Sequence, residues 1–137
     1  MPAYRNHNTS STPTLSTSAI NFEQIDAQLF NQVALSTAKT ISSDKTNKPT
    51  QLRRFYDEIV MWDNKIMMYP DKFTEYRPFI LMLNAKTAYA KGRKLVDQNY
   101  VNLLEHCTKQ VTNPETMRIF KLFMEAFMGF YKEKSSD

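Results

Sequence analysis

Between residues 50 and 66 the apolar side chains recur at steps of three and four residues. This spacing lays them along one side of an α-helix, and such a helix needs partners because its aromatic stripe cannot remain in water. Thr50 follows Pro49 and is predicted to cap this helix through its hydroxyl. The stripe consists of Leu52, Phe55, Tyr56, Ile59, Trp62 and Ile66.

Helical periodicity recurs in four further segments. Only two glycines occur among 137 residues, and Val and Ile are sparse beside Leu, Met, Phe and Ala, which disfavours a turn-rich β protein. The fold class is therefore predicted to be all-α, a compact bundle of about five helices. The helices are predicted from an Asn21 cap to about Thr40, from Thr50 to about Met68, from Pro78 to about Gly92, from Asp97 to Val111, and from Asn113 to Tyr131.

The chain is predicted to divide into a tail, one domain and a second short tail. Residues 1–19 are rich in Ser, Thr, Asn and Pro and are expected to be disordered. Residues 20–132 are expected to form the bundle, and residues 133–137 a polar C-terminal tail. The sequence leaves the role of the N-terminal segment open.

The third predicted helix is expected to be central. Phe79 to Leu83 is apolar all round, and Ala85, Ala88 and Tyr89 are expected to continue its buried side. Tyr69-Pro70-Asp71 is expected to end the second helix and to begin a connection that reaches residue 77. Gly92 could end the third helix or lie within it, and the sequence does not decide.

Two short segments carry most of the excess positive charge. Residues 39–54 hold five basic residues and one acid, and residues 86–94 hold four basic residues and no acid, so each segment has a net charge of +4. The whole chain has a formal net charge of +4, so the residues outside these two segments carry a net charge of −4. Concentrated patches of this kind favour a polyanion as partner.

Arg53 and Arg54 lie in the first turn of the second helix, with Lys48 just before it. A helix N-terminus presents free backbone N–H groups and partial positive charge, so arginines there are well placed to bind a phosphate. The alternative is that the arginines form intrahelical ion pairs with Asp57 and Glu58, four residues further on. Both interpretations remain open from the sequence.

Residues that could perform chemistry are few. His106 and Cys107 are adjacent and point about 100° apart on a helix, so they do not form a nucleophile–base pair. One cysteine and two scattered histidines give no zinc-ligand spacing, and no phosphate-binding glycine loop occurs. We therefore predict no enzymatic activity, no metal and no cofactor. The lone cysteine suits a reducing cytosol, and no apolar run is long enough to span a membrane.

Two motifs carry a resemblance to a known family. Thr50-Gln-Leu-Arg-Arg-Phe-Tyr56 opens one helix, and Ala85-Lys-Thr-Ala-Tyr-Ala-Lys-Gly-Arg93 closes the next. Together with the size of the chain, they resemble the Csm small subunit of type III-A CRISPR–Cas effector complexes over roughly residues 22–131. The Ser/Thr-rich start before Asn21 is not part of the family pattern.

The resemblance implies a non-catalytic, cytoplasmic subunit in antiviral defence. Several copies stack head to tail beside other Csm subunits and lie along the guide RNA and the target RNA. A subunit that is repeated along a variable guide should bind phosphates and A-form shape, without reading bases. The matching motifs carry over Arg53, Arg54, Lys86 and Arg93 as RNA-binding residues, and charge and helix position add Lys48, Gln51, Lys91 and Lys94.

Two other classes of protein share some of these features. A helix-turn-helix DNA-binding regulator would place one helix in a major groove, but the connection over residues 69–77 is too long for its tight turn. A purely structural bundle would use the aromatic stripes without binding nucleic acid. The sequence does not give the copy number, the solution oligomer or the individual residues that touch RNA.

Overall fold

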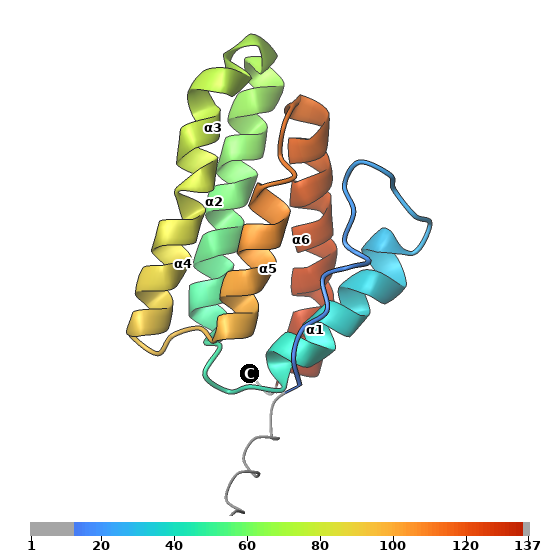
Figure 1. The fold of residues 1–137 in the computed structure, drawn as a ribbon, viewed down its shortest axis with the longest axis vertical. Helices are drawn as coiled ribbons and strands as arrows, with labels where there is room; N and C mark the ends of the chain where they lie inside the picture. Colours follow the sequence, from blue (N-terminus) through green and yellow to red (C-terminus); the bar gives the residue numbers. More distant parts are fainter. Residues whose placement is uncertain (1–12, 136–137) are drawn as a thin grey trace, which may run out of the picture.

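Helices pack side by side along most of the chain (Figure 1). The structure is a computed structural model that describes residues 13–135, and no strand occurs in that range. Because α3 and α4 are separated by Met82 alone, the helices form five rods, and the predicted all-α bundle is confirmed. The elements are the π-helix η2 (Leu29–Val33), α1 (Ala34–Ser42), α2 (Pro49–Met68), the 3-10 helix η3 (Pro70–Lys72), α3 (Phe73–Leu81), α4 (Leu83–Gly92), α5 (Gln98–Thr108) and α6 (Pro114–Lys134).

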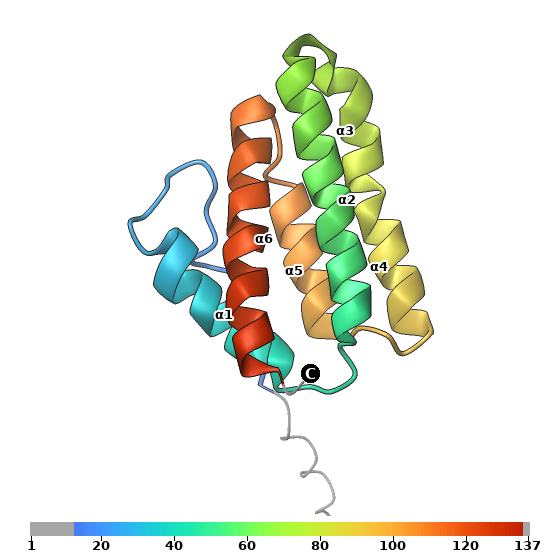
Figure 2. The same ribbon diagram turned by 180° about the vertical axis from the view of Figure 1, so that it is seen from behind.

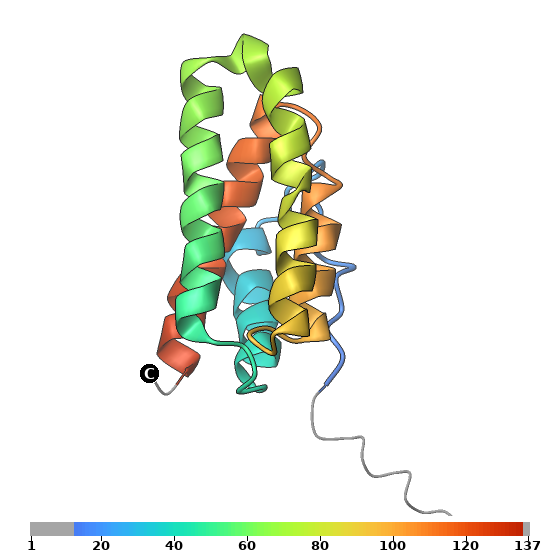
Figure 3. The ribbon, with the colours of Figure 1, turned by 90° about the vertical axis from the view of Figure 1, so that its left-hand side faces the viewer.

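The rods have a simple arrangement. α2 runs the length of the bundle, and α3 and α4 return beside it in the opposite direction (Figures 1 and 3). α5 packs against α4, while α6 packs against both α1 and α2. α1 crosses α6 obliquely, as the view from behind also shows (Figure 2). The start of α2 and the end of α4 therefore lie at the same end of the molecule.

The starts of α5 and α6 follow from their first residues. The Asp97 side chain accepts a hydrogen bond from the backbone N–H of Tyr100 at 2.9 Å. The Asn113 side chain accepts from the N–H of Thr116 at 2.8 Å, and the N–H of Asn113 donates to the Thr116 hydroxyl at 3.1 Å. Pro114 fills the first helical position, where a missing N–H costs no hydrogen bond. The predicted starts of the fourth and fifth helices are confirmed.

Much of the core comes from the predicted apolar stripes of the second, fourth and fifth helices, and buried residues of α1 and of the α3–α4 rod complete it. The ring of Phe127 lies 6.4 Å from that of Tyr100 and 5.8 Å from that of Tyr131, so aromatic side chains of α5 and α6 contact one another directly. Removing such side chains from water is the main favourable term in folding. The buried residues of these stripes include Leu52, Phe55, Ile59, Ile66, Leu103, Leu104, Cys107, Met117, Phe120, Phe123 and Met124.

The first helix begins later than its sequence pattern predicts. Asn21 does not cap a helix; its side-chain oxygen accepts from the N–H groups of Glu23 at 2.9 Å and Gln24 at 3.1 Å, which makes a local turn. Asp26 closes a second turn by accepting from the N–H of Gln28 at 2.7 Å. Such side-chain bonds compete with helix formation. Regular α-helix therefore begins only at Ala34, after the π-helix.

The second helix has the predicted length but a different cap. It starts at Pro49, with Lys48 in the N-cap position and no side-chain hydrogen bond to the free N–H groups. Proline at the first helical position has a fixed φ that suits the helix, so the chain turns helical one residue before Thr50. The prediction that Thr50 is the cap is wrong.

The third predicted helix differs most from expectation. The predicted connection is largely helical, because η3 and α3 begin at Pro70 and Phe73, and Pro78 lies inside α3. Helical bonds continue past Met82, whose N–H donates to the Pro78 carbonyl at 3.0 Å. The rod also lies at the surface, since Phe79 is 51 % exposed and Met82 is 52 % exposed. The prediction of a central helix that starts at Pro78 is wrong.

The buried side of α4 is turned relative to the prediction. Leu83, Thr87 and Ala90 face the core, whereas Ala85, Ala88 and Tyr89 are exposed. Thr87 can be buried because its hydroxyl donates to the carbonyl of Asn84 at 3.1 Å, within the helix itself. A pattern of polar and apolar residues cannot reveal such a buried threonine, because it counts threonine as polar and does not show that the hydroxyl bonds within the helix.

Residues before the first helix lie along α5. The Asn99 side chain accepts from the N–H of Leu15 at 3.0 Å and donates to the carbonyl of Pro13 at 2.8 Å. Further on, His106 donates to the carbonyl of Ile20 at 2.7 Å. Residues 1–12 of the predicted tail, and residues 136–137, lie outside the described residues. The division into tails and bundle stays a prediction.

Candidate nucleic-acid interface

A backbone hydrogen bond joins the two basic segments. The N–H of Lys48, at the start of α2, donates to the carbonyl of Leu95, just after α4, at 3.0 Å. The two segments lie 32 or more positions apart in the sequence but meet at one end of the bundle (Figure 1). We refer to residues 48–54 and 86–94 together as the basic end.

Asn47 holds the basic end in place. It is 2 % exposed, and its side chain donates to the carbonyl of Ile41 at 3.0 Å and accepts from the N–H of Asp97 at 2.8 Å. Its own carbonyl accepts from the Tyr131 hydroxyl at 2.9 Å. One buried residue thus connects α1, α2, α5 and α6, and a buried polar network that is satisfied in this way fixes the position of its neighbours.

The end of α4 is closed by Lys94 rather than by glycine. Lys94 has a φ of 63°, and its N–H donates to the carbonyl of Lys91 at 2.9 Å. The next N–H, from Leu95, donates to the carbonyl of Ala90 at 2.9 Å. This pattern is a Schellman motif, whose left-handed position usually holds glycine. Gly92 lies within α4 as its last residue, and Lys94 rather than Gly92 occupies the C′ position, which decides between the two alternatives that the sequence left open.

All eight predicted site residues belong to the basic end. Seven are exposed and Gln51 is half-buried, so their side chains are open to a partner. Arg53 pairs with Asp57 at 3.4 Å, but both side chains are well exposed and a pair of this kind contributes little free energy. The exposed members are Lys48, Arg53, Arg54, Lys86, Lys91, Arg93 and Lys94.

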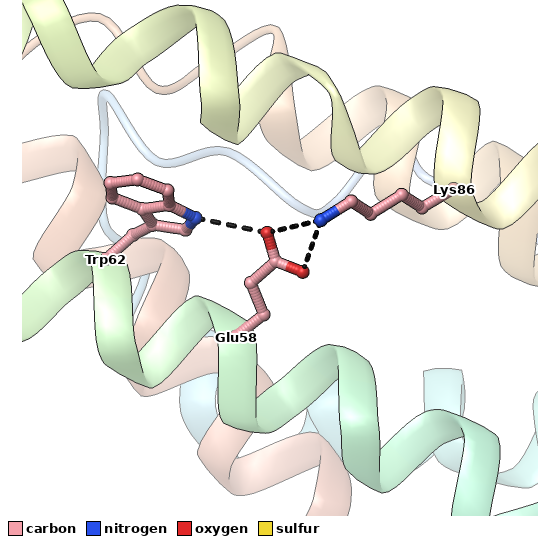
Figure 4. Close-up of polar contacts among 3 residues, drawn as sticks. All are labelled: Glu58, Trp62 and Lys86. Atoms are coloured by element: carbon pink, nitrogen blue, oxygen red, sulfur yellow. Dashed lines mark hydrogen bonds and ion pairs between the residues drawn. The ribbon is translucent and has the colours of Figure 1, made fainter.

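Glu58 does not form the ion pair with Arg54 that was one of the two open interpretations. Its carboxylate instead accepts from the Lys86 ammonium at 2.9 and 3.0 Å and from the indole N–H of Trp62 at 3.1 Å (Figure 4). This contact bridges α2 and α4. No acidic residue occurs within residues 86–94, but the fold brings Glu58 of α2 next to Lys86. The positive charge of this segment is therefore partly compensated, which corrects the interpretation from the sequence. Within residues 13–135, no ion pair to Arg54 is found.

Tyr89 is a surface residue of the basic end. The sequence favoured a core position, but the residue is 69 % exposed, and the Arg93 guanidinium carbon lies 5.9 Å from the centre of its ring. The error follows from the turned buried side of α4. The sequence thus placed Tyr89 beside these cations but favoured a buried position over a base-stacking one, and that preference is wrong.

Two carboxylates border the basic end. Burial acts to raise the pKa of Asp44, but hydrogen bonds from Thr46 outweigh it and lower the pKa on balance. Burial raises the pKa of Asp97, against a hydrogen bond from the N–H of Tyr100. Asp44 lines a small polar hollow together with Lys48, so this border is less positive than the lysines and arginines alone imply.

His106 and Cys107, the adjacent residues considered for chemistry, do not act on each other in the structure. Cys107 is fully buried, and burial raises the pKa of its thiol, which keeps it in the unreactive neutral form. His106 is engaged with the Ile20 carbonyl rather than with the thiol. In the same range, no group of three His, Cys, Asp or Glu side chains could hold a metal ion.

Comparison with known proteins identifies the family. The family model described as Csm2 Type III-A matches residues 24–137, which is most of the chain and includes the whole basic end. The chain belongs to the Csm2 type III-A family. No curated protein and no solved structure matches the chain significantly.

Family membership makes the chain a subunit of a type III-A CRISPR complex, and so a partner of other Csm subunits. The resemblance drawn from the two helix motifs is thereby confirmed. None of the helices in the described part of the chain is long and apolar enough to cross a membrane. Membership does not itself assign a role to any side chain of the basic end.

Proposed function

We propose that this Csm2-family subunit binds the sugar–phosphate backbone of guide and target RNA through its basic end, without reading their sequence. The observation that carries the proposal is the convergence of seven exposed cations on one end of the bundle. Phosphate contacts of lysine and arginine supply affinity and position but carry no sequence information. A subunit that serves any guide needs binding of this kind.

The start of α2 supports phosphate binding in a second way. No side chain caps its first N–H groups, and the helix dipole adds partial positive charge there. Arg53 and Arg54 follow within the first turn and a half. This nearness supports the proposal that the N-terminus and the arginines bind phosphate together.

The subunit is proposed to be non-catalytic and to stack in several copies. Each copy can bind RNA weakly, because linked copies raise the effective concentration of the next binding site. At the end of α2 opposite the basic end, Met67, Met68 and Tyr69 are 60 %, 69 % and 46 % exposed. This apolar surface is available for contact with a neighbouring copy or another Csm subunit.

The rival proposal of a helix-turn-helix regulator has less support. Its two helices meet at about 90–120° across a tight turn, so that one can enter a major groove. α2 and the α3–α4 rod instead run antiparallel along each other (Figure 3). The family match points to an RNA-guided complex as well.

Photo-crosslinking in the assembled complex tests the proposal. Guide and target RNA carrying photoreactive uridines would be irradiated, and the crosslinked peptides of this subunit mapped by mass spectrometry. We expect crosslinks in residues 48–54 and 86–94, whatever the guide sequence. Crosslinks confined to η3 and the far end of α2, or their absence from this subunit, would refute the assignment.

A further inference from the structure

Tyr89 and its neighbours form an ordered stripe on α4. Lys86, Tyr89 and Arg93 are spaced at three and four residues, so they share one face of the helix. Lys86 and Arg93 are separated by about 10 Å along the axis, given a rise of about 1.5 Å per residue. The exposed ring thus has one cation on each side along the helix.

A single exposed aromatic residue is ordinary on a protein surface. The position of Tyr89 is what distinguishes it, because it lies between two cations that the proposed function assigns to phosphates. The Arg93 guanidinium lies over the ring, 5.9 Å from its centre, and the residue remains 69 % exposed. An aromatic ring beside backbone-binding cations is the arrangement with which proteins bind single-stranded nucleic acid.

We infer that Tyr89, supported by Arg93, stacks on an unpaired RNA base. The inference rests on the proposed function and adds the kind of RNA that the basic end takes. A paired A-form helix keeps its bases stacked inside and offers only their edges and backbone. The Tyr89 ring can therefore act only where a nucleotide is unpaired or turned out of the duplex, and the basic end binds such RNA more tightly than a continuous duplex.

The test compares three variants of the full chain. Tyr89→Ala removes the ring, and Tyr89→Phe keeps the ring but not the hydroxyl. Tyr69→Ala is the matched control, because Tyr69 is also exposed and has the Lys72 ammonium 5.4 Å from its ring centre, at the opposite end of α2. The probes are a single-stranded RNA, the same RNA with abasic positions, and the same sequence as a blunt duplex.

We expect Tyr89→Ala to weaken binding of the intact single strand about tenfold, within the range measured for stacking on one base. Tyr89→Phe and Tyr69→Ala should bind like the parent. On the abasic strand and on the duplex, Tyr89→Ala should have no effect. A 2-aminopurine in the single strand should be quenched by the parent and not by Tyr89→Ala.

Two results would overturn the inference. Equal weakening of intact and abasic strands would mean that Tyr89 acts through position or charge, and unchanged binding of the intact strand would mean that the ring does not touch RNA. Either result leaves the proposed phosphate contacts standing, since those depend on the cations. Melting temperatures verify folding, and they should not change because Tyr89 lies at the surface.

Discussion

Arg118 of α6 reaches a carboxylate of α2 that is almost fully buried: its Nη2 lies 3.2 Å from Oδ2 of Asp63, which is 1 % exposed. Within residues 13–135, neither carboxylate oxygen accepts a hydrogen bond. Burial raises the pKa of Asp63, and the charge of Arg118 only partly opposes this. An aspartate in such a site weakens the fold at neutral pH compared with an uncharged side chain.

Asp63→Asn should therefore change how stability depends on pH. A folded-state pKa above the ordinary 3.8 means that the folded protein binds the proton more tightly. The resulting stabilisation is fully present below pH 3.8 and is lost as pH rises through the folded-state pKa. The stability of the parent relative to Asp63→Asn should thus fall over that window, as measured by urea unfolding at a series of pH values. A rise with pH in the stability of the parent relative to Asp63→Asn would contradict this prediction.

Glu58→Gln should strengthen RNA binding. Glu58 competes with phosphate for Lys86, so removal of its charge frees that ammonium, while glutamine can still accept the bond from Trp62. We expect a gain of a few fold in affinity and a loss of stability of about 1 kcal/mol or less, since water still reaches the pair: the Lys86 side chain is 45 % exposed and that of Glu58 is 21 % exposed. Fluorescence anisotropy measures the affinity. Glu75→Gln, an exposed acid of α3, serves as the charge-matched control and should have a smaller effect.

Lys94→Gly should move stability and RNA affinity in opposite directions. A non-glycine residue with a left-handed φ costs about 1 kcal/mol, so glycine should raise the free energy of unfolding by about that amount. The same change removes a cation from the basic end and should weaken RNA binding. Lys94→Ala separates the two effects, because it removes the charge but keeps the strain. If Lys94→Gly bound RNA more weakly than the parent while Lys94→Ala bound like the parent, the charge of Lys94 would have no role in binding.

Phe22→Ala should destabilise the fold far more than deletion of residues 1–19. Phe22 is 1 % exposed, and its ring lies 6.0 Å from those of both Phe120 and Phe123. Loss of a buried phenylalanine costs about 3–5 kcal/mol. Of the described residues 13–19, the deletion removes half-buried Leu15, the two bonds to Asn99 and the bond from the Ile20 N–H to the Thr17 carbonyl, and it should cost much less. Chemical denaturation of both proteins measures the difference, and equal costs would contradict this prediction.

Much of the fold could be predicted from residue spacing and caps. The stripe of α6, the Asn113 and Asp97 caps and the placement of both basic segments at one end follow from local rules and from the antiparallel order of consecutive helices. These features are local or depend only on the direction of the chain. They can therefore be predicted without knowing which helix faces pack against one another.

The errors came from features that depend on tertiary context. The buried face of α4 is set by Thr87, which satisfies its own hydroxyl, and this turned Tyr89 outward against the apolar pattern. Of the two interpretations that the sequence left open for Arg54 and Glu58, the ion pair does not form, because α4 brings Lys86 within reach of Glu58. The late start of α1 reflects side-chain turns at Asn21 and Asp26 that outcompete the helix. Residue spacing alone does not reveal these choices.

The salt dependence of RNA binding shows whether the cations of the basic end neutralise phosphates. The variant Arg53→Ala/Arg54→Ala/Lys86→Ala/Arg93→Ala would be compared with the parent by anisotropy from low to physiological salt, on RNAs of unrelated sequence. A control variant, Lys65→Ala/Lys72→Ala/Lys109→Ala, removes exposed cations near the opposite ends of α2 and α5. Its binding should resemble that of the parent, and the melting temperatures of both variants should stay near the parent value.

We predict that the quadruple variant binds all the RNAs more weakly and to a similar degree. The slope of log affinity against log salt should flatten by about one unit for each phosphate that the variant no longer neutralises. Parent-like affinity and slope at physiological salt would contradict the assignment of the basic end to RNA.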